Sequence, residues 1–545
     1  MDNGQLIMDM KPKYTSLRSV RRGLAASATA LCLLALTACN SDDSTIADEL
    51  VSDIVIGDLV QGSTINVISY QGNLIQANPQ VTTTYAESEL TYEWYLVDNA
   101  AQPLQVWKEG DPITFDREHI ASGRSLSYEV NLSPGSYTLI FEVSADNGYT
   151  AAKTATINAV TDYSQGFYIL KETADGKTEL DLLNTTGYTD LDEGRTAENV
   201  FIENVLTKMH GSPFPAQPQC LSTAINHCYI DTVTNTPQSA NLVTVSTTDG
   251  QIYAMRNSDL RIVLTRDNLL FTDMQPDETP YRIVSGMWGC YLITNKGIRF
   301  QYDTAMGGQQ GSGRYALESS MGASRWVVYD DASSGLFFWD EESHSIGVSD
   351  YNGTTTVAQD DHYKLSGLSR MNCVAAGFCG ATQQVVFVLS SLDGSQRQIV
   401  QIASGFSGSL EVQAMRALRG NKVNTAHLFT VSCASAAFLY GVVENAIYGL
   451  DLTNYTEQEI KPKGMADDEE IIYISNQYGG MGNPYDYLVV GTRRGTDGYT
   501  LRFYKLLGGL PDGEPVYTLQ GTGTPKAIHF TGQGQSGFFN IPLQD

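Results

Sequence analysis

Histidines, carboxylates and glycine-rich turns are the groups in this sequence that could perform chemistry. The chain has 545 residues, among them seven histidines and 61 aspartates and glutamates. It contains no Gly-Xaa-Ser-Xaa-Gly nucleophile elbow, no His-Glu-Xaa-Xaa-His zinc motif and no Gly-Xaa-Xaa-Xaa-Xaa-Gly-Lys phosphate loop. The glycine-rich run 307–313 lacks a lysine and a following helical pattern, so we interpret it as a loop. We therefore expect no catalytic residues and no enzymatic activity.

Two enzymatic alternatives stay open. Paired carboxylates could cleave glycosides, and a Ser-His-Asp triad could form from scattered residues. The acidic runs 340–342 and 467–470 are interpreted as solvated loops. A weak calcium contact is their alternative role, because calcium prefers carboxylate oxygens. Cys220, His227 and Cys228 lie close together, but no second ligand pair follows at zinc spacing, so we expect no metal site and no cofactor.

Tryptophan side chains give the stronger indication of a binding role. An exposed tryptophan or tyrosine ring can stack on the apolar face of a sugar or on a peptide side chain. Trp107 lies in the polar loop 105–110, where we expect it to be exposed. The other candidates lie in or beside apparent strands, so packing between sheets is their main alternative. The candidate ligand-binding residues are Trp107, Trp288, Trp326 and Trp339.

The elements that would position these rings are almost all strands. Between residues 53 and 160, polar and apolar residues alternate in short runs separated by turns. The run 91–97 places Tyr92, Trp94 and Leu96 on one face. Period-two alternation over about 100 residues, with a tryptophan in a middle strand, is typical of an immunoglobulin-like β-sandwich. We predict such a sandwich over 53–160, with Trp94 in its core.

From residue 161 to 545 the sequence repeats an apolar strand, a tight turn and a second strand. Seven such units occur, with turns about 40 to 75 residues apart, a spacing that indicates a β-propeller. Each sheet of a propeller covers the faces of its neighbours. We predict an all-β chain whose segment 161–545 is a seven-bladed propeller, closed by the run 527–530. Six or eight blades, or stacked sandwiches, are the alternatives.

The N-terminal residues have the features of an export signal. Basic residues precede the apolar run 23–36, which is too short to span a membrane comfortably. Leu36-Thr37-Ala38-Cys39 matches the bacterial lipobox, so we predict a signal peptide over 1–38 and lipidation of Cys39. The acidic start of the tether 39–52 resembles the surface-export signal of Bacteroidetes lipoproteins. That resemblance implies an outer-membrane lipoprotein facing the cell exterior; a tether that stays in the periplasm is the alternative.

The net charge argues against nucleic acid as a partner, and the cysteines bear on which disulfides could form. The formal net charge is −27, and an acidic protein repels nucleic acid, because phosphate contacts need Lys and Arg. An exported chain can form disulfides. Two local pairs, Cys220 with Cys228 and Cys373 with Cys379, are close enough in sequence to form. Cys290 and Cys433 lie in strand-like runs, where we expect buried thiols.

The order of these features resembles a known family. Tyr92-Glu93-Trp94-Tyr95, 122–128 and 132–137 lie in the predicted sandwich, and 166–170 opens the second half. This order is similar to the PKD-like family of Bacteroidetes lipoproteins over nearly the whole chain. The Trp-Xaa-Phe-Gly-Asp-Gly pattern of ordinary PKD domains is absent. The resemblance implies a PKD-like sandwich and an accessory lipoprotein beside SusC/SusD-type uptake systems, and it supplies no catalytic residues.

We therefore expect a non-catalytic binding or accessory component of a TonB-dependent uptake system for a glycan or peptide nutrient. Its partners would be the outer membrane, through the lipid anchor, and a SusC/SusD-type transporter complex. An extracellular propeller hydrolase or lyase acting on polysaccharide is the enzymatic alternative. A structural adhesin is the third.

Overall fold

The computed structural model describes most of the chain from residue 54 onwards. The described residues are 54–69, 74–99, 117–130, 132, 134–185, 199–232, 235–286, 289–302, 313–316, 325–330, 335–350, 354–357, 365, 367–403, 410–432, 436–479, 485–496 and 498–531. Cys39, the predicted signal peptide 1–38 and the predicted tether 39–52 lie outside these residues. No helix of the described residues is long and apolar enough to cross a membrane.

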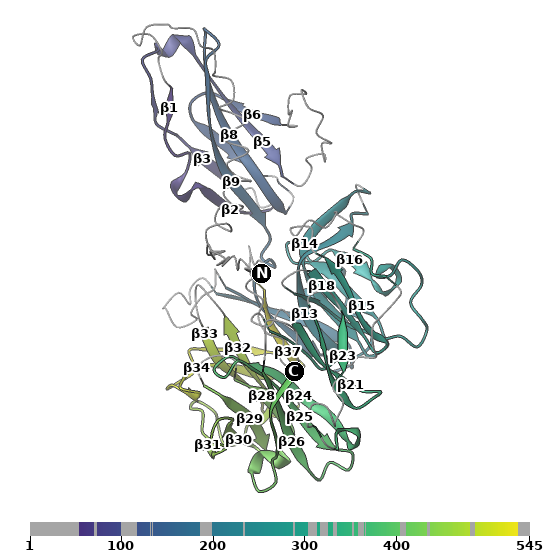
Figure 1. Ribbon diagram of the computed structural model, residues 1–545. Coiled ribbons are helices and arrows are strands. Elements are labelled where there is room, and N and C mark those ends of the chain that lie inside the picture. The colour runs from purple at the N-terminus through teal and green to yellow at the C-terminus, as the bar shows by residue number, and fades with distance from the viewer. Residues whose placement is uncertain are drawn as a thin grey trace, which may run out of the picture.

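The first nine strands form a β-sandwich (Figure 1). Its larger sheet has the order β2-β9-β8-β5-β6, with β2 parallel to β9 and the other neighbours antiparallel. The strands of that sheet are β2 (Thr64–Ile68), β5 (Leu90–Asp98), β6 (Glu118–Ser122), β8 (Gly135–Ala145) and β9 (Thr150–Val160). Two short sheets complete the domain, made by β1 (Val55–Ile56) with β4 (Val81–Thr82) and by β3 (Leu74–Ala77) with β7 (Leu126–Glu129). The single-turn helices are η1 (Gln61–Ser63) and η2 (Glu87–Glu89).

Alternation along β5 decides which side chains enter the core of the sandwich. Tyr92, Trp94 and Leu96 are buried, as predicted, and Trp94 is fully covered. Its ring lies 4.3 Å from that of Phe141, and its Nε1 donates a 2.9 Å hydrogen bond to the Gly123 carbonyl. The intervening residues of β5 therefore face outwards.

The rest of the described chain forms a ring of antiparallel sheets, as expected for a β-propeller. Seven sheets occur within the described part of 166–531. The first three contain β10 (Gly166–Glu172), β11 (Thr178–Asn184) and β12 (Val200–Ile202), joined by β37 (Thr524–Thr531); β13 (Pro218–Ile230), β14 (Pro237–Thr247), β15 (Ile252–Arg256) and β16 (Ile262–Thr265); and β17 (Pro280–Ser285), β18 (Gly289–Thr294) and β19 (Gly297–Tyr302).

Four further sheets follow in sequence order. They contain β20 (Val327–Asp330), β21 (Gly335–Asp340), β22 (Ser345–Ser349) and β23 (Thr355–Val357); β24 (Met371–Cys379), β25 (Gln384–Ser391), β26 (Arg397–Ala403) and β27 (Glu411–Ala417); β28 (Leu428–Val431), β29 (Phe438–Val443), β30 (Ala446–Asp451) and β31 (Glu457–Ile460); and β32 (Glu470–Gly479), β33 (Tyr485–Arg493), β34 (Tyr499–Leu507), β35 (Leu510–Pro511) and β36 (Tyr517–Gly521). The short helices are α2 (Val205–His210), η4 (Arg266–Asn268), η6 (Leu368–Arg370) and η7 (Lys422–Thr425).

A hydrophobic cluster fills each junction between neighbouring sheets. The cluster of Phe167, Phe503 and Phe530 joins the last sheet to the first, so the ring is closed. The strand that closes it is β37, which contains the run 527–530 and pairs antiparallel with β10. Because β37 is far from β10 in sequence, the ring closes only when the two ends of the segment meet.

Three turns between the second and third strands of their sheets share one motif. Thr173, Thr247 and Ser391 each donate a side-chain hydrogen bond of 2.5–2.6 Å to an aspartate two residues later. The residue after each aspartate is a glycine with φ between 70° and 79°, a conformation that other residues rarely adopt. The repeated Thr/Ser-Xaa-Asp-Gly sequence is thus a local signal of the sheet repeat.

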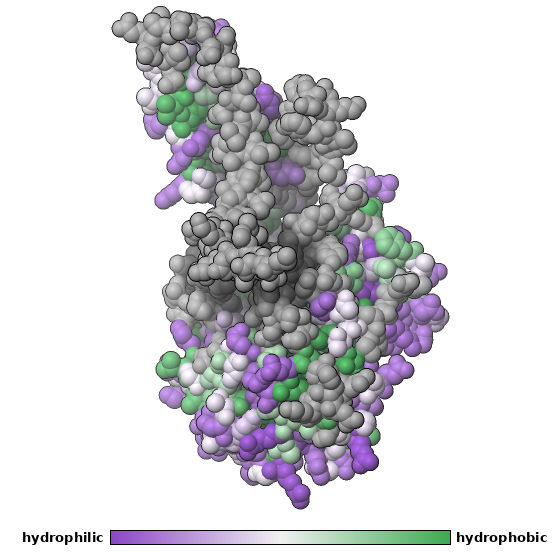
Figure 2. Space-filling model, viewed as in Figure 1, coloured by the Kyte–Doolittle hydropathy of each residue, from purple (hydrophilic) through white to green (hydrophobic). Residues whose placement is uncertain are grey.

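A short connection joins the sandwich to the propeller. Within 161–165, Asp162 accepts a 2.5 Å hydrogen bond from Asn184 and Ser164 accepts a 3.4 Å bond from Asn257, both through main-chain carbonyls. Thr161 also donates to the Ser258 carbonyl. These bonds tie the connection to the first two sheets of the propeller. In the view of Figure 2, hydrophilic residues line the outer edge of the propeller, and hydrophobic residues occur in small groups between them.

Neither of the two local cysteine pairs that the sequence spacing allowed forms a disulfide. All five cysteines in the described part of the chain are buried and none forms a disulfide. Cys220 and Cys228 lie on the single strand β13, and Cys373 and Cys379 on β24. A strand advances about 3.3 Å per residue, so six residues separate two cysteines by about 20 Å. A disulfide needs Cα atoms within about 7 Å, and short sequence spacing was therefore the wrong criterion. Cys290 is buried as expected, and Cys433 lies outside the described residues.

Candidate ligand-binding face

The structure separates the four candidate tryptophans into two groups. Trp107 and Trp288 lie outside the described residues. Trp326 and Trp339 are buried, at 9% and 0% exposure, in the cluster that joins the fourth and fifth sheets. Both rings therefore pack between sheets, which was the alternative to a ligand-binding role, and neither ring presents a face to a ligand.

A partly exposed cluster of polar and aromatic side chains lies on the outward face of β5 and β6. Glu93 and Tyr95 alternate with the buried Trp94, and they lie opposite Ser122 and His119 on the neighbouring strand. A bulge between Trp94 and Tyr95 sets this register. The side chains of His119 and Glu93 are 50% and 33% exposed, so a ligand in solution can reach them.

Glu93 is the centre of this cluster. One of its carboxylate oxygens, Oε2, lies 2.5 Å from His119 Nε2 and accepts a 2.7 Å hydrogen bond from Ser122 Oγ. Hydrogen bonds from Ser122 and then from His119 lower the pKa of Glu93. The carboxylate is therefore ionised at neutral pH, and its other oxygen has lone pairs that a ligand hydroxyl or amide could use.

The same three residue types form catalytic triads in hydrolases, but the geometry here differs. In a triad the acid binds one ring nitrogen of the histidine and the serine binds the other. Here Nε2 of His119 approaches both Glu93 and Ser122, the latter at 3.2 Å, and Ser122 donates directly to the acid. This arrangement cannot pass a proton from serine through histidine to the carboxylate. It holds three side chains in a fixed hydrogen-bonding pattern instead.

An aromatic ring flanks the cluster. The Arg117 guanidinium carbon lies 3.9 Å from the centre of the Tyr95 ring, and Arg117 also forms a 2.7 Å ion pair with Glu142 of β8. The His119 ring meets Tyr95 edge-on, with ring centres 5.5 Å apart. We call Glu93, Tyr95, Arg117, His119 and Ser122 the outward face of the sandwich. It combines an aromatic surface with charged hydrogen-bonding groups, which suits binding of polar ligands.

The sequence analysis did not predict this face. The pattern that could have indicated it is the alternation in Tyr92-Glu93-Trp94-Tyr95, which places Glu93 and Tyr95 outside once Trp94 is buried. Nothing in the sequence identified His119 or Ser122 as their neighbours, because the register of β6 depends on the bulge.

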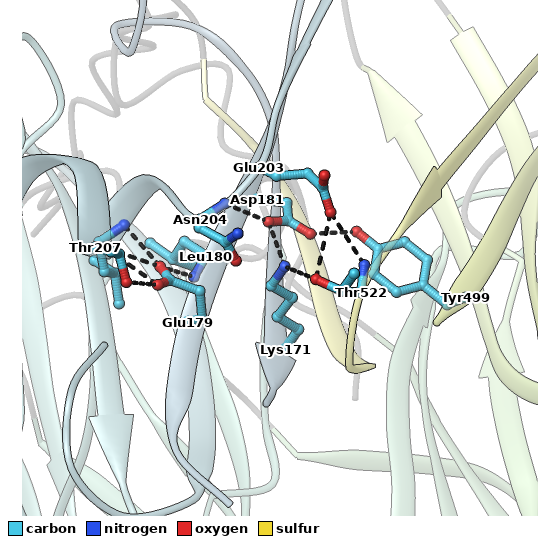
Figure 3. A network of polar contacts seen from close by, with 10 residues as sticks. Lys171, Glu179, Leu180, Asp181, Glu203, Asn204, Thr207, Tyr499 and Thr522 are labelled. Atoms are coloured by element: carbon cyan, nitrogen blue, oxygen red, sulfur yellow. Dashed lines mark hydrogen bonds and ion pairs between the residues drawn. The ribbon is translucent and has the colours of Figure 1, made fainter. Parts of the chain in front are cut away.

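A second polar network lies inside the propeller, at the junction of the first and last sheets (Figure 3). Lys171 Nζ forms a 2.7 Å ion pair with Asp181 Oδ1, and Tyr499 donates a 2.6 Å hydrogen bond to Asp181 Oδ2. The Asn204 backbone N–H donates a further 2.8 Å bond to Asp181. Burial raises the pKa of Asp181, although Lys171 acts in the opposite direction.

These residue types could do acid–base chemistry, but a substrate cannot reach them. Lys171, Asp181 and Tyr499 are at most 3% exposed. Tyr499 comes from the last sheet, whereas Lys171 and Asp181 come from the first. The network therefore holds the ring closed.

Two other sheets of the propeller each contain a buried ion pair between a glutamate and an arginine. Glu278 pairs with Arg299 at 2.6 Å and accepts a 2.8 Å hydrogen bond from Thr294. Glu469 in the same way pairs with Arg502 at 2.7 Å and accepts from Thr492 at 2.5 Å. In both, the glutamate precedes the first strand, the threonine ends or nearly ends the second and the arginine lies on the third.

The interpretation of the acidic runs as solvated loops is therefore wrong in part. Glu469 is buried, and so is Asp340, whose carboxylate accepts hydrogen bonds from Glu342 N–H at 3.0 Å and Ser343 Oγ at 2.5 Å. Asp467, Asp468 and Glu470 are exposed. Among the described residues, no group of three or more His, Cys, Asp or Glu side chains is placed to hold a metal ion.

Comparison with known proteins gives one family and several distant structures. A quinoprotein alcohol dehydrogenase-like protein from Bacteroides thetaiotaomicron is 13% identical, covers 87% of this chain and 99% of its own, and has a TM-score of 0.39. The WD40 domain of SCAP from fission yeast is 12% identical over 58% of this chain and 73% of its own, with a TM-score of 0.31.

A third structure is the extracellular domain assigned to a hybrid two-component system of B. thetaiotaomicron. It is 11% identical, over 84% of this chain and 68% of its own, with a TM-score of 0.33. No curated protein sequence matches the chain significantly. Residues 49–218 match the model of the PKD-like family. They span the sandwich and the strands β10, β11 and β12 of the propeller. This part of the chain is similar to that family.

Proposed function

We propose that this chain is an outer-membrane lipoprotein that faces the cell exterior and binds a nutrient ligand, a glycan or a peptide, without catalysing its cleavage. It would act as an accessory component of a TonB-dependent, SusC/SusD-type uptake system. The observation that carries the binding role is the outward face of the sandwich. It provides a partly buried ring and carboxylate, from Tyr95 and Glu93, and an exposed guanidinium, from Arg117, within one small area.

The chemistry of this face supports binding over cleavage. Glu93, His119 and Ser122 are bonded to one another in a pattern that blocks proton relay. The PKD-like match over 49–218 and the resemblance of the N-terminal residues to exported lipoproteins support the location. A propeller brings loops from every sheet to each end of the ring, which suits a recognition surface of its own.

The outward face can be tested by substitution in soluble protein that begins after Cys39. Tyr95→Ala is expected to weaken binding by about 2 kcal/mol, since removing an aromatic anchor typically has that effect. Tyr95→Phe should retain most of the affinity, because the ring remains. The measurement is calorimetric titration with soluble polysaccharides and with a peptide digest of denatured protein. Trp107→Ala, chosen from the sequence, is a second variant in the same assay.

Thr91→Ala is the matched control, because Thr91 is an exposed outward residue of the same strand, away from Tyr95. Equal affinity for Tyr95→Ala and wild type would show that ligand binds elsewhere. Release of reducing ends or new amines above a heat-killed control would favour the hydrolase alternative.

The anchor and its orientation require a test in cells. Cys39→Ala is expected to abolish incorporation of a clickable fatty acid, since the thiol is the acceptor atom. Proteinase added to intact cells should degrade the wild-type chain while a periplasmic marker stays whole. Unchanged labelling of Cys39→Ala would contradict the lipid anchor. Full protection from the proteinase would contradict the surface location.

A further inference from the structure

Three neighbouring strands of the propeller, β37, β13 and β17, carry two buried histidines and a buried arginine. His529 lies on β37, the closing strand, and His227 lies on β13. They are 7% and 2% exposed, and Arg282 of β17 is 2% exposed. β13 packs against both β37 and β17, so it is the strand shared by the two junctions.

We propose that acid opens the ring of sheets on the two sides of β13, before the rest of the propeller unfolds. This device is independent of the proposed ligand-binding role, because it concerns the propeller and not the outward face of the sandwich.

His529 joins the closing strand to the second sheet. Its Nε2 lies 2.9 Å from Thr223 Oγ1 of β13, a contact between residues 306 positions apart in sequence. Tyr168 of β10 lies opposite His529 in the strand register, and Gln477 of β32 donates a 3.0 Å hydrogen bond to the carbonyl of the preceding residue, Ile528. The surroundings offer hydroxyls and amides, but no carboxylate of the described residues contacts the ring to stabilise a positive charge.

His227 holds the other side of β13. Its Nε2 lies 2.8 Å from the Tyr315 hydroxyl, and its Nδ1 lies 2.7 Å from the Cys228 carbonyl. Both Tyr315 and the flanking Tyr229 belong to the cluster that joins the second and third sheets. Protonation of His227 would thus place a charge inside a hydrophobic junction.

The charges nearest these two rings do not compensate such protonation. Burial lowers the pKa of His529 to about 4, and Arg282 repels a second positive charge. Burial likewise lowers the pKa of His227 to about 4. Lys171, further along β10, is already paired with Asp181. His210 at the end of α2, beside the same pair of sheets, also has its pKa lowered by burial.

The direction of the pH effect follows from these values. When a junction opens, its histidine regains an ordinary pKa near 6.5. Between pH 6.5 and 4 the open form therefore binds protons that the closed form does not. For each histidine, lowering the pH by one unit in that window raises the equilibrium constant for opening about tenfold. Over the whole window the constant therefore rises about a hundredfold or more. Below pH 4 the effect is complete.

Cysteines already present in the chain can report where the ring opens. Cys220 and Cys228 lie on β13, whereas Cys373 and Cys379 lie on β24 in the fifth sheet. All four are buried, at 0–7% exposure. Soluble protein beginning after Cys39 is treated with 4,4′-dithiodipyridine, which reacts with thiols in acid, at pH 7 and pH 4.5. The labelled positions are then identified by peptide mass spectrometry.

Labelling of Cys220 and Cys228 is expected to accelerate at least about tenfold more than that of Cys373 and Cys379 on going to pH 4.5, given the proton linkage above. Equal acceleration at all four would mean uniform unfolding and would overturn the proposal. So would the absence of acceleration at β13.

Variants then test the cause. His529→Gln and His227→Gln each keep a hydrogen-bonding side chain and remove the titration, so each should reduce the selective acceleration at β13. His427→Gln, at an exposed histidine directly before β28, should leave it unchanged. Retention of the full effect in the double variant would overturn the assignment to these histidines. If a variant does not fold at pH 7, the comparison of cysteines in the wild-type chain still decides.

Discussion

Replacing Asp181 with alanine is expected to lower the free energy of unfolding of the propeller by about 3–5 kcal/mol. The reason is that Lys171, 1% exposed, would lose its carboxylate and keep its charge in the interior. Tyr499 would lose its acceptor in the same step, and with it the bond that connects the last sheet to the first. Asp181→Ala should therefore destabilise the closed ring more than removal of a single hydrogen bond would.

The measurement is urea unfolding followed by circular dichroism, with the propeller and sandwich transitions fitted separately. Asp277→Ala is the matched control, because Asp277 pairs with Lys296 at the same distance of 2.7 Å while the two side chains are 71% and 46% exposed. That control should unfold like the wild type, since solvent screens the pair. The double variant Lys171→Met/Asp181→Leu should recover much of the loss, because neither charge is left buried. Wild-type stability of Asp181→Ala would contradict a closing role for the network.

Trp339→Ala is expected to destabilise the propeller by about 3–5 kcal/mol, through the cavity it leaves between the fourth and fifth sheets. Trp339 is fully buried on β21, in a cluster with Trp326 and Leu389. A smaller side chain would leave a void that neighbouring strands, fixed by their ladders, fill only partly. Scanning calorimetry should show a lower propeller transition and an unchanged sandwich transition.

Leu392→Ala is the control, because Leu392 is 62% exposed in the turn after β25. It should leave both transitions in place. Ligand binding at a temperature where Trp339→Ala is still folded should equal that of wild type. Weaker binding with wild-type stability would instead make Trp339 a ligand contact.

The two carboxylate runs illustrate the difference between local and tertiary information. Asp467, Asp468 and Glu470 are exposed, as a polar loop predicts, yet Glu469 between them is buried against Arg502. Hydropathy treats these four acids alike. Which one enters the interior depends on where the third strand of the sheet carries its arginine, and that partner lies 33 residues away.

Much of the architecture follows from local sequence pattern. Alternation in 91–97 predicted the buried face of β5, because successive side chains of a strand point to opposite sides. Repeated strand–turn–strand units predicted a ring of sheets, because turns such as Thr247-Thr248-Asp249-Gly250 are closed by hydrogen bonds within a few residues. The run 527–530, in the last segment of the chain, was expected to close the ring, and β37 does so by pairing with β10.

Contacts between distant segments decided the remaining features. The pairing of β37 with β10, the burial of Trp326 and Trp339, and the meeting of Glu93 with His119 each join residues whose separation in sequence says nothing about their distance in space. The cysteines show the converse, since Cys373 and Cys379 are close in sequence and far apart along one strand. By itself the sequence determined the strands and turns, because these depend on near neighbours; only the tertiary structure decided which polar groups are buried and which are presented to a ligand, because burial depends on the sheet packed alongside.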